Sequence, residues 1–268
     1  MDTVAGQQEL GFERLYLQTF QPVPTPEQVA AEVDGLVKLL KLAPYAPVLN
    51  LGSGSGEHAV ELARRGFNVT ALDVSDELQA DTRRSAEALG IPVKWIRREL
   101  QRIPFRGTFD AVVTFDSGFG CSPSVEKDRE ILHAVYRALR PGGQVLLDVM
   151  NRERVIRDFV PRRWSESDGV RVLEEQEWDL LANELKARWI FLFPDRRELT
   201  RDSRIRVHPA HEIATMFRDA GFSPVTAYGD FSGQPYTLTS PRLILIGRRG
   251  GTTLEAPAGV SLSHHEPF

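Results

Sequence analysis

The sequence predicts an α/β fold in which a doubly wound, mostly parallel seven-stranded sheet carries an inserted antiparallel β meander. Short apolar runs alternate with helical segments over residues 45–150, which requires crossover connections and therefore parallel strands. Between residues 151 and 208 the pattern changes to long stretches in which polar and apolar residues alternate. A helix and two further strands follow over residues 209–249, and we expect them to complete the core.

The N-terminal segment, residues 1–44, is predicted to be helical. Thr25 can accept hydrogen bonds from the first free amides of a helix, Pro26 suits its first turn, and Gln28 can reach back to the cap. We expect the helix that starts there to run to about Leu42.

The strands and helices of the core follow from apolar runs and from the glycines that end helices. The predicted strands are residues 47–51, 69–72, 93–96, 109–115, 144–150, 225–231 and 242–248. The predicted helices run from Glu57 to Gly66, from Ser75 to Gly90, from Val125 to Arg140 and from about Pro209 to Gly221. Only a loop separates the last two strands, so that pair can be antiparallel.

The insertion at residues 151–208 has predicted turns at 182–184 and 194–196. One face of its middle strand is apolar by period two and consists of Ala187, Trp189, Phe191 and Phe193. We expect the main domain or a second subunit to cover that face, which makes a homodimer through the insertion one possibility. Residues 250–268 are rich in Gly, Pro, Ser and Thr and are expected to be loose.

Composition and charge narrow the classes of partner. The chain has 33 Lys and Arg against 37 Asp and Glu, and no long basic run that would collect phosphates, so we expect no nucleic-acid partner. The single cysteine, Cys121, excludes an intramolecular disulfide and is typical of the reducing cytoplasm. The sequence has no apolar stretch of membrane-spanning length, and acidic residues stand where a signal peptide would be basic, so we expect no membrane partner.

The strongest local motif is a buried strand that opens into Gly52-Ser53-Gly54-Ser55-Gly56 and then a helix. Glycines let a backbone run close to a ligand. Glu57 stands where the nicotinamide-dinucleotide fingerprint has its third glycine, and its carboxylate would repel a pyrophosphate. Asp73 lies 21 residues after Gly52, at the end of the second strand, where a carboxylate can accept both hydroxyls of a ribose. The alternative is that the glycines only make a tight turn and that Asp73 only caps the next helix.

Over about residues 45–150 the chain resembles the class I S-adenosylmethionine-dependent methyltransferases, in particular the small-molecule branch. The resemblance rests on Asn-Leu-Gly-Ser-Gly-Ser-Gly at 50–56, Leu-Asp-Val-Ser at 72–75, Glu-Leu-Gln-Arg-Ile-Pro-Phe at 99–105 and Leu-Arg-Pro-Gly-Gly at 139–143, before the fifth strand. It implies a sheet order of 3-2-1-4-5-7-6. It also implies S-adenosylmethionine as the cofactor and S-adenosylhomocysteine as the product.

The resemblance implies a cofactor site made of Asn50, Gly52, Ser53, Gly54, Gly56, Asp73, Val74, Glu99, Leu100 and Phe115. The three glycines would approach the methionine end of the cofactor, Asp73 would hold its ribose, and Glu99 with Leu100 would lie near the adenine. The chain departs from the family pattern at two of these positions. Asn50 replaces a common acidic residue, and Glu99 is one methylene longer than the usual aspartate.

The expected reaction is transfer of a methyl group to N or O of a small-molecule acceptor. A sulfonium makes its methyl group electrophilic, so orientation of the acceptor and exclusion of water supply most of what catalysis needs. Two alternatives are a non-catalytic protein that binds a cofactor or a partner, and an NAD-dependent oxidoreductase on a similar fold. Glu57 and the Leu-Arg-Pro-Gly-Gly run argue against the oxidoreductase.

Candidates for the acceptor side lie after the fourth strand. Asp116 could position an acceptor amine or take its proton, or it could be a loop residue that satisfies nearby amides. Asp148 and Asn151 would complete a magnesium site with Asp116, but the adjacent acidic-Asn pair expected there is missing, so no metal is predicted. Tyr16 lies in an amphipathic stretch that either packs in the core or closes over the cofactor pocket.

A further candidate lies at the end of the insertion. Arg204, Arg206 and His208 share a strand face by period two and could bind an acceptor anion. A solvated charged strand edge is the commoner explanation. We interpret the insertion as an acceptor lid or a subunit contact, and we expect His58 to be an ordinary residue of a helix surface.

Overall fold

The computed structural model describes residues 24–115, 119–122, 124–167 and 169–251. The larger sheet consists of β1 (Pro47–Leu51), β2 (Asn68–Asp73), β3 (Val93–Arg97), β4 (Phe109–Thr114), β5 (Leu139–Met150), β10 (Phe222–Tyr228) and β11 (Arg242–Arg249). The smaller sheet consists of β6 (Arg162–Ser167), β7 (Val170–Asp179), β8 (Glu184–Leu192) and β9 (Glu198–Arg206). The helices are α2 (Pro26–Leu40), α3 (Glu57–Arg64), α4 (Asp76–Ala88), α5 (Val125–Ala138), α6 (Arg152–Arg157) and α7 (Ala210–Asp219).

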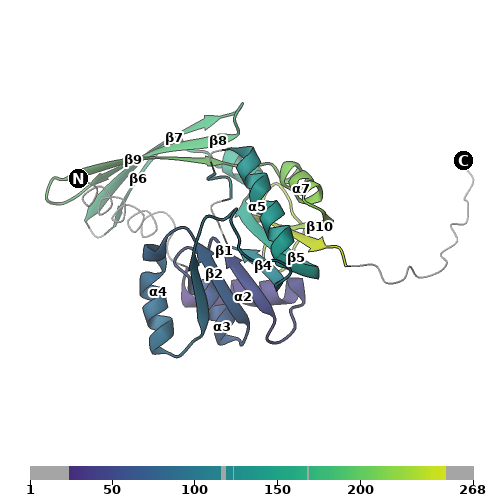
Figure 1. Cartoon of the computed structure of the whole chain (residues 1–268). Coiled ribbons are helices and arrows are strands. Elements are labelled where there is room, and N and C mark those ends of the chain that lie inside the picture. Colours follow the sequence, from purple (N-terminus) through teal and green to yellow (C-terminus); the bar gives the residue numbers. More distant parts are fainter. Residues whose placement is uncertain (1–23, 116–118, 123, 168, 252–268) are drawn as a thin grey trace, which may run out of the picture.

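The seven-stranded sheet has the order β10-β11-β5-β4-β1-β2-β3, which confirms the predicted order 3-2-1-4-5-7-6. The first five strands pair in parallel, whereas β11 runs antiparallel to both β5 and β10. The carboxyl ends of the parallel strands therefore meet at one edge of the sheet. Figure 1 shows the four-stranded sheet standing beyond the larger sheet, joined to it through the chain after β5.

Helices cover both faces of the larger sheet and divide the core into two apolar clusters. On one face α2 and α3 bury residues such as Leu36 and Leu62 against β1, β2 and β4. On the other face α5 and α7 bury Leu132 and Phe217 against β4, β5 and β11. In the described part of the chain, no helix is long and apolar enough to cross a membrane.

Helix α2 starts at the predicted capping box. The Thr25 side chain accepts a hydrogen bond from the Gln28 amide, and the Gln28 side chain accepts one from the Thr25 amide. The helix ends at Leu40 rather than Leu42, because Lys41 turns into the left-handed region at φ +50° and donates its amide to the last carbonyls.

The start of β5 was predicted too late. The strand begins at Leu139, five residues before Gln144, and its pairing with β4 shifts register between Phe109 and Ala111. Gly142 at φ +82° permits this register shift. The Pro-Gly-Gly run is the reason why the sequence suggested a loop at these residues. The strand predicted at 225–231 is also displaced: β10 ends at Tyr228, and Phe231 belongs to the loop that leads to β11.

The smaller sheet is the predicted antiparallel meander. Its strands pair in sequence order, and the turns place Asn183 at φ +53° and Arg196 at φ +71°. Ala187, Trp189 and Phe191 are buried on one face, as their period-two spacing predicts. Helix α6 was not predicted; Asn151 caps it by accepting hydrogen bonds from the amides of Glu153 and Arg154.

Candidate functional site

The loop between β1 and α3 has a backbone that requires glycine. Gly52, Gly54 and Gly56 have φ values of +64°, +55° and +95°, a region that side chains with a Cβ rarely adopt. The Gly52 amide donates to the carbonyl of Leu72 at 2.8 Å, so the loop is tied to the end of β2. The loop and the acidic strand end are therefore parts of one structure.

The glycines of this loop differ in what surrounds them. A Cβ added to Gly54 would meet no atom within 4 Å, whereas a Cβ on Gly56 would lie 2.8 Å from the Trp95 ring. The missing side chain of Gly54 thus leaves space beside the loop that a ligand can use. The missing side chain of Gly56 lets α3 approach β3.

Asp73 is buried at the end of β2 and faces the loop. Its Oδ2 accepts the Gly54 amide at 2.8 Å, and its Oδ1 accepts the Ser75 amide at 3.1 Å. Burial raises the pKa of Asp73, and these backbone hydrogen bonds offset part of that increase. The cap of α4 is Ser75, whose hydroxyl accepts the Leu78 amide. Because each carboxylate oxygen has two lone pairs, Asp73 keeps acceptor capacity for a diol.

Asn50 and Ser53 are buried beside the same loop. The Asn50 amide nitrogen donates to the Val113 carbonyl at 3.4 Å, while its Oδ1 is buried without a hydrogen-bond partner among the described residues. The Ser53 hydroxyl accepts from Gln79 at 2.7 Å, so it links the loop to α4. An aspartate at position 50 would set a carboxylate against a carbonyl oxygen, which gives a physical reason for asparagine here.

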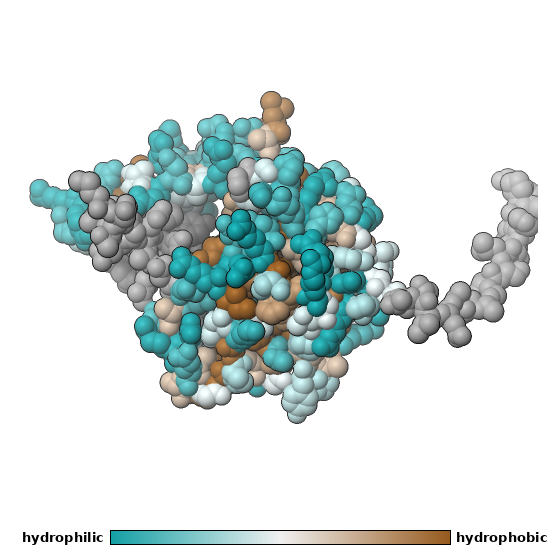
Figure 2. Space-filling model, in the orientation of Figure 1, coloured by the Kyte–Doolittle hydropathy of each residue, from teal (hydrophilic) through white to brown (hydrophobic). Residues whose placement is uncertain are grey.

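The residues predicted near the adenine surround the end of β3. Glu99 is half exposed and binds Gln101 and Arg102, so its carboxylate reaches solvent. Leu100 packs against the core and lines an apolar cavity of about 10 Å³. Val74 is 54% exposed, and its carbonyl accepts from Arg97. In Figure 2, hydrophobic side chains reach the surface of this face between α4 and α5.

A group that we did not predict from the sequence lies on the α2 and α3 side of the strand ends. His58, expected on a helix surface, has a side chain only 13% exposed, and its Nε2 lies 2.7 Å from Glu32 of α2. Its ring stacks on Phe115 with centroids 3.9 Å apart. Glu32 also accepts from Arg242 at 2.8 Å, and Arg242 pairs with Asp148 at the end of β5. No local motif marks this group, because its members are distant in the sequence.

The predicted cationic face of the insertion is already paired with carboxylates of the chain itself. Asp128 of α5 is fully buried, and its Oδ2 lies 2.9 Å from His208 Nε2 and 3.6 Å from Arg206 Nη1. Arg206 also donates to Glu184 at 3.0 Å, whereas Arg204 is exposed at the rim. Arg206 and His208 are thus neither a solvated edge nor a free anion site.

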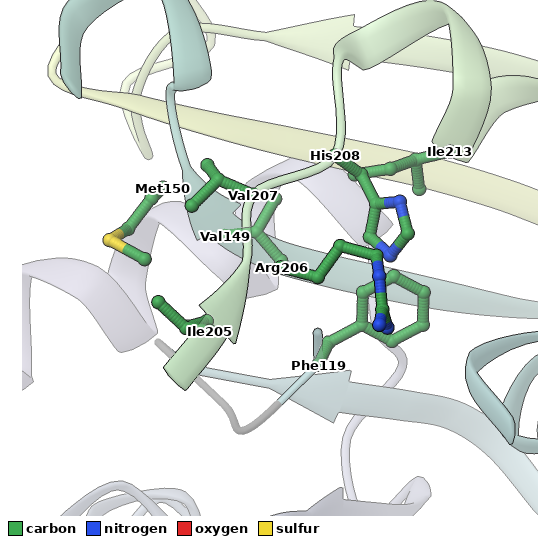
Figure 3. Close-up of a pocket in the computed structure, with 8 residues that line it drawn as sticks. All are labelled: Phe119, Val149, Met150, Ile205, Arg206, Val207, His208 and Ile213. Carbon is green, nitrogen blue, oxygen red and sulfur yellow. The ribbon is translucent and has the colours of Figure 1, made fainter. Parts of the chain in front are cut away.

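These side chains also close a small cavity between the insertion and the core. Figure 3 shows Arg206 and His208 beside the Phe119 ring, with Val149 and Met150 of β5 opposite Ile205 and Val207. The cavity has a volume of about 20 Å³, enough for one water molecule. The cavity is too small for an acceptor. The side chains that line it join the insertion to the core.

Two predicted residues, Tyr16 and Asp116, lie outside the described residues. The two remaining members of the magnesium hypothesis are used within the fold. Asp148 pairs with Arg242, and the Asn151 amide donates to the carbonyls of Thr237 and Ser240. Across the described ranges, no group of three or more His, Cys, Asp or Glu side chains is arranged to hold a metal ion.

Comparisons with known proteins agree with this geometry. A family model described as a methyltransferase domain matches residues 48–143, from the start of β1 into the first part of β5. A glycine/sarcosine N-methyltransferase of Halorhodospira halochloris is 25% identical over 217 residues, which cover 75% of this chain and 74% of that protein. Together these matches support a class I S-adenosylmethionine-dependent methyltransferase.

Solved structures show the same fold over most of the methyltransferase. An S-adenosylmethionine-dependent methyltransferase from Clostridium acetobutylicum has a TM-score of 0.75 at 14% identity, covering 90% of this chain and 98% of that one. CalS10, an amino pentose methyltransferase from Micromonospora echinaspora solved with S-adenosylmethionine bound, has a TM-score of 0.65 at 20% identity, covering 88% and 96%.

The residues of the methyltransferase fit its cofactor. The space beside Gly54, the buried carboxylate of Asp73 and the unpartnered acceptor of Asn50 lie along adjacent strand ends, as a nucleoside with a polar tail requires. S-adenosylmethionine supplies a methyl group activated by a sulfonium. The alternative of an NAD-dependent oxidoreductase is therefore not retained.

Proposed function

We propose that this methyltransferase transfers the methyl group to an amine nitrogen of a small, polar acceptor. The observation that carries the proposal is the match over three quarters of the chain to a protein named glycine/sarcosine N-methyltransferase. The fold of an amino pentose methyltransferase adds support, because it covers nearly the whole of both chains. Both names describe acceptors in which a nitrogen can receive the methyl group.

The chain's part in the reaction is to bind, orient and shield. Asp73 and the glycine loop would fix the adenosine at β1 and β2, so that the reacting methyl group lies toward β4 and β5. Phe115 is 9% exposed at the end of β4 and would exclude water from that side. An amine attacks with its own lone pair, so no nucleophilic side chain is needed. The proton that leaves the nitrogen needs only an acceptor, and Asp116 is a candidate.

The insertion is proposed to choose the acceptor. It leaves from the end of β5, beside the strand ends, and residues at that edge of α/β sheets commonly shape substrate chambers. A contact between the insertion and the loop after β4 supports this role. The Arg206 amide donates a hydrogen bond to the Gly120 carbonyl at 2.8 Å. A substitution in the insertion would then alter acceptor use while cofactor affinity stays nearly constant.

A labelling assay tests the proposal. The purified enzyme is incubated with methyl-labelled S-adenosylmethionine and with two probe sets: amines such as glycine, sarcosine and an amino sugar, and the matching hydroxyl compounds. We expect label in at least one amine, and much less label at limiting cofactor when Asp73→Ala replaces the wild type. Transfer confined to the hydroxyl compounds would contradict N-methylation. Consumption of the cofactor without label in either set of compounds would contradict a small polar acceptor.

We further propose a homodimer formed through the insertion, working in the cytoplasm and without a nucleic-acid partner. The outer face of the small sheet carries Trp164, 70% exposed, and Leu173, 39% exposed, beside a groove of about 330 Å³. Such apolar exposure is typical of subunit contacts. Sedimentation of wild type and Trp164→Lys tests the dimer: we expect the variant to be lighter, and equal mass for both proteins would argue against this interface.

A further inference from the structure

Asp128 connects two segments of the chain that lie where the parallel strands end. One segment is residues 119–122, in the loop after β4, and the other is the end of the insertion, residues 206–208. Asp128 itself is fully buried near the start of α5. A buried carboxylate persists only with partners that compensate its charge and its lone pairs. Its partners therefore show which segments it holds.

The two oxygens of Asp128 contact different segments. Oδ1 accepts hydrogen bonds from the Gly120 amide at 3.2 Å and from the Ser122 hydroxyl at 2.5 Å, both in the loop. Oδ2 lies 2.9 Å from His208 Nε2 and 3.6 Å from Arg206 Nη1, both in the insertion. One side chain thus fixes the loop and the insertion relative to the same point on α5.

The two segments also touch each other directly at Gly120. The Arg206 amide donates to the Gly120 carbonyl at 2.8 Å. Gly120 has a φ of +91°, and a Cβ added to it would lie 2.1 Å from the Arg206 carbonyl oxygen. The loop and the insertion therefore approach each other backbone to backbone, which only glycine permits at this position. The Phe119 ring lies beside the His208 ring, with centroids 5.7 Å apart (Figure 3).

Charge compensation in the insertion does not account for the contacts to the loop. Arg206 has Glu184 as a further acidic partner, and His208 has Glu212. A carboxylate that only balanced these two side chains would need no hydrogen bond from the loop after β4. Because ligands of open α/β sheets bind at the carboxyl ends of the strands, a shift of either segment would displace a wall of the acceptor space.

We propose that Asp128 is a positioning residue for methyl transfer, which holds residues 119–122 and the end of the insertion as one unit that places the acceptor against the cofactor. Asp128 acts through the two segments and needs no contact with the acceptor. The inference rests on the proposed function for the nature of the acceptor only. Since a misplacement of about 1 Å can reduce a rate about 100-fold, the unit affects turnover more than cofactor affinity.

Gly120→Ala tests the unit without changing any charge, because the added methyl group must push the loop away from the Arg206 carbonyl. We expect kcat to fall at least about tenfold with whichever of glycine, sarcosine and the amino sugar the wild type labels best. The dissociation constant of S-adenosylhomocysteine should stay within about twofold. Gly90→Ala is the matched control: Gly90 also has a positive φ, +68°, but a Cβ there would meet no atom within 4 Å. This control should change neither quantity.

Two variants of His208 provide a second test if Gly120→Ala does not fold. His208→Phe leaves a ring beside Phe119 but no donor for Asp128, whereas His208→Gln restores an N–H group. We expect kcat to fall in His208→Phe and to recover in part in His208→Gln, with S-adenosylhomocysteine affinity unchanged in both. An unchanged kcat in His208→Phe would contradict the positioning role. A loss of kcat that His208→Gln does not recover, or that S-adenosylhomocysteine affinity follows, would indicate a purely structural contact.

Hydrogen exchange of the enzyme with S-adenosylhomocysteine tests the unit without any acceptor. In His208→Phe the amides of β9 and of residues 119–122 should exchange faster together, because both segments depend on Asp128. Faster exchange in β9 alone would show that the loop is held independently, which contradicts the unit. A wild type that labels no amine would contradict the proposed function but would not alter this exchange result, so the two failures are distinguishable.

Discussion

At the scale of residues, hydrogen bonds within the chain fix the group that we propose as the cofactor site. Asp73 is oriented by two backbone amides, one from the glycine loop and one from the start of α4. These contacts are local to a strand-loop-helix motif, which is why spacing alone could single out Asp73 and Gly54 as candidates; their contact with the cofactor stays a prediction. His58 and Asp128 could not be found that way, since their partners Glu32 and His208 lie 26 and 80 residues away. The sequence carries no short signature of such pairs.

Alanine substitutions at two glycines of the same loop should have different effects on stability and on cofactor binding. At Gly54 the added Cβ meets no protein atom, so Gly54→Ala should cost about 1–2 kcal/mol in backbone strain and weaken S-adenosylhomocysteine binding strongly. At Gly56 the Cβ would lie 2.8 Å from the Trp95 ring, so Gly56→Ala should lower the melting temperature more. Melting and calorimetry on both variants check this. A greater loss of binding in Gly56→Ala, at equal stability, would reverse the two roles.

The raised pKa of Asp73 makes its effect on stability depend on pH. A carboxyl group with a raised folded-state pKa favours the protonated form, so its contribution to stability is present below the unfolded pKa and is lost as pH rises through the folded one. The uncharged Asp73→Asn variant has no such loss. Its melting temperature relative to wild type, without ligand, should therefore increase between pH 4 and pH 7. A decrease over that range would show that the charged form is favoured in the fold.

At the scale of elements, a buried ionic contact joins the end of the insertion to α5. Asp128 of α5 holds His208 and Arg206, and it also accepts the Gly120 amide of the loop after β4 at 3.2 Å. The meander and its turns could be predicted from apolar residues that alternate with a period of two and from residues typical of turns. The early start of β5 did not, because a Pro-Gly-Gly run is typical of a loop and only pairing with β4 makes it a strand.

Removal of Asp128 should destabilise the fold far more than removal of an exposed partner. Asp128→Ala leaves the buried Arg206 with only Glu184 and the buried His208 with only Glu212 as an acidic partner, and breaking a buried pair typically costs about 3–5 kcal/mol. Asp202→Ala removes the exposed partner of Arg188 within β8 and β9 and should change stability little. Urea unfolding of both variants measures the difference. Equal, small losses would mean that the insertion is held by other contacts.

At the scale of the whole molecule, the sheet order brings every part of the proposed site to one edge. The loop after β1, Asp73 on β2 and Phe115 after β4 meet where the crossover connections change direction, between β1 and β4. The insertion leaves from β5 at the same edge. The family resemblance implied this sheet order, whereas the burial of Arg206 and His208 required the structure.

The most direct test of this account is the thermal stability of wild type and Asp73→Ala with S-adenosylhomocysteine. A ligand that binds only the folded state stabilises it by about 2.7 kcal/mol at a hundred times its dissociation constant. We predict that stabilisation for wild type, and a dissociation constant at least about tenfold higher for Asp73→Ala, because charge-assisted hydrogen bonds contribute about 1.5–3 kcal/mol. Equal stabilisation of both folded proteins would contradict the placement of the cofactor at Asp73 and Gly54.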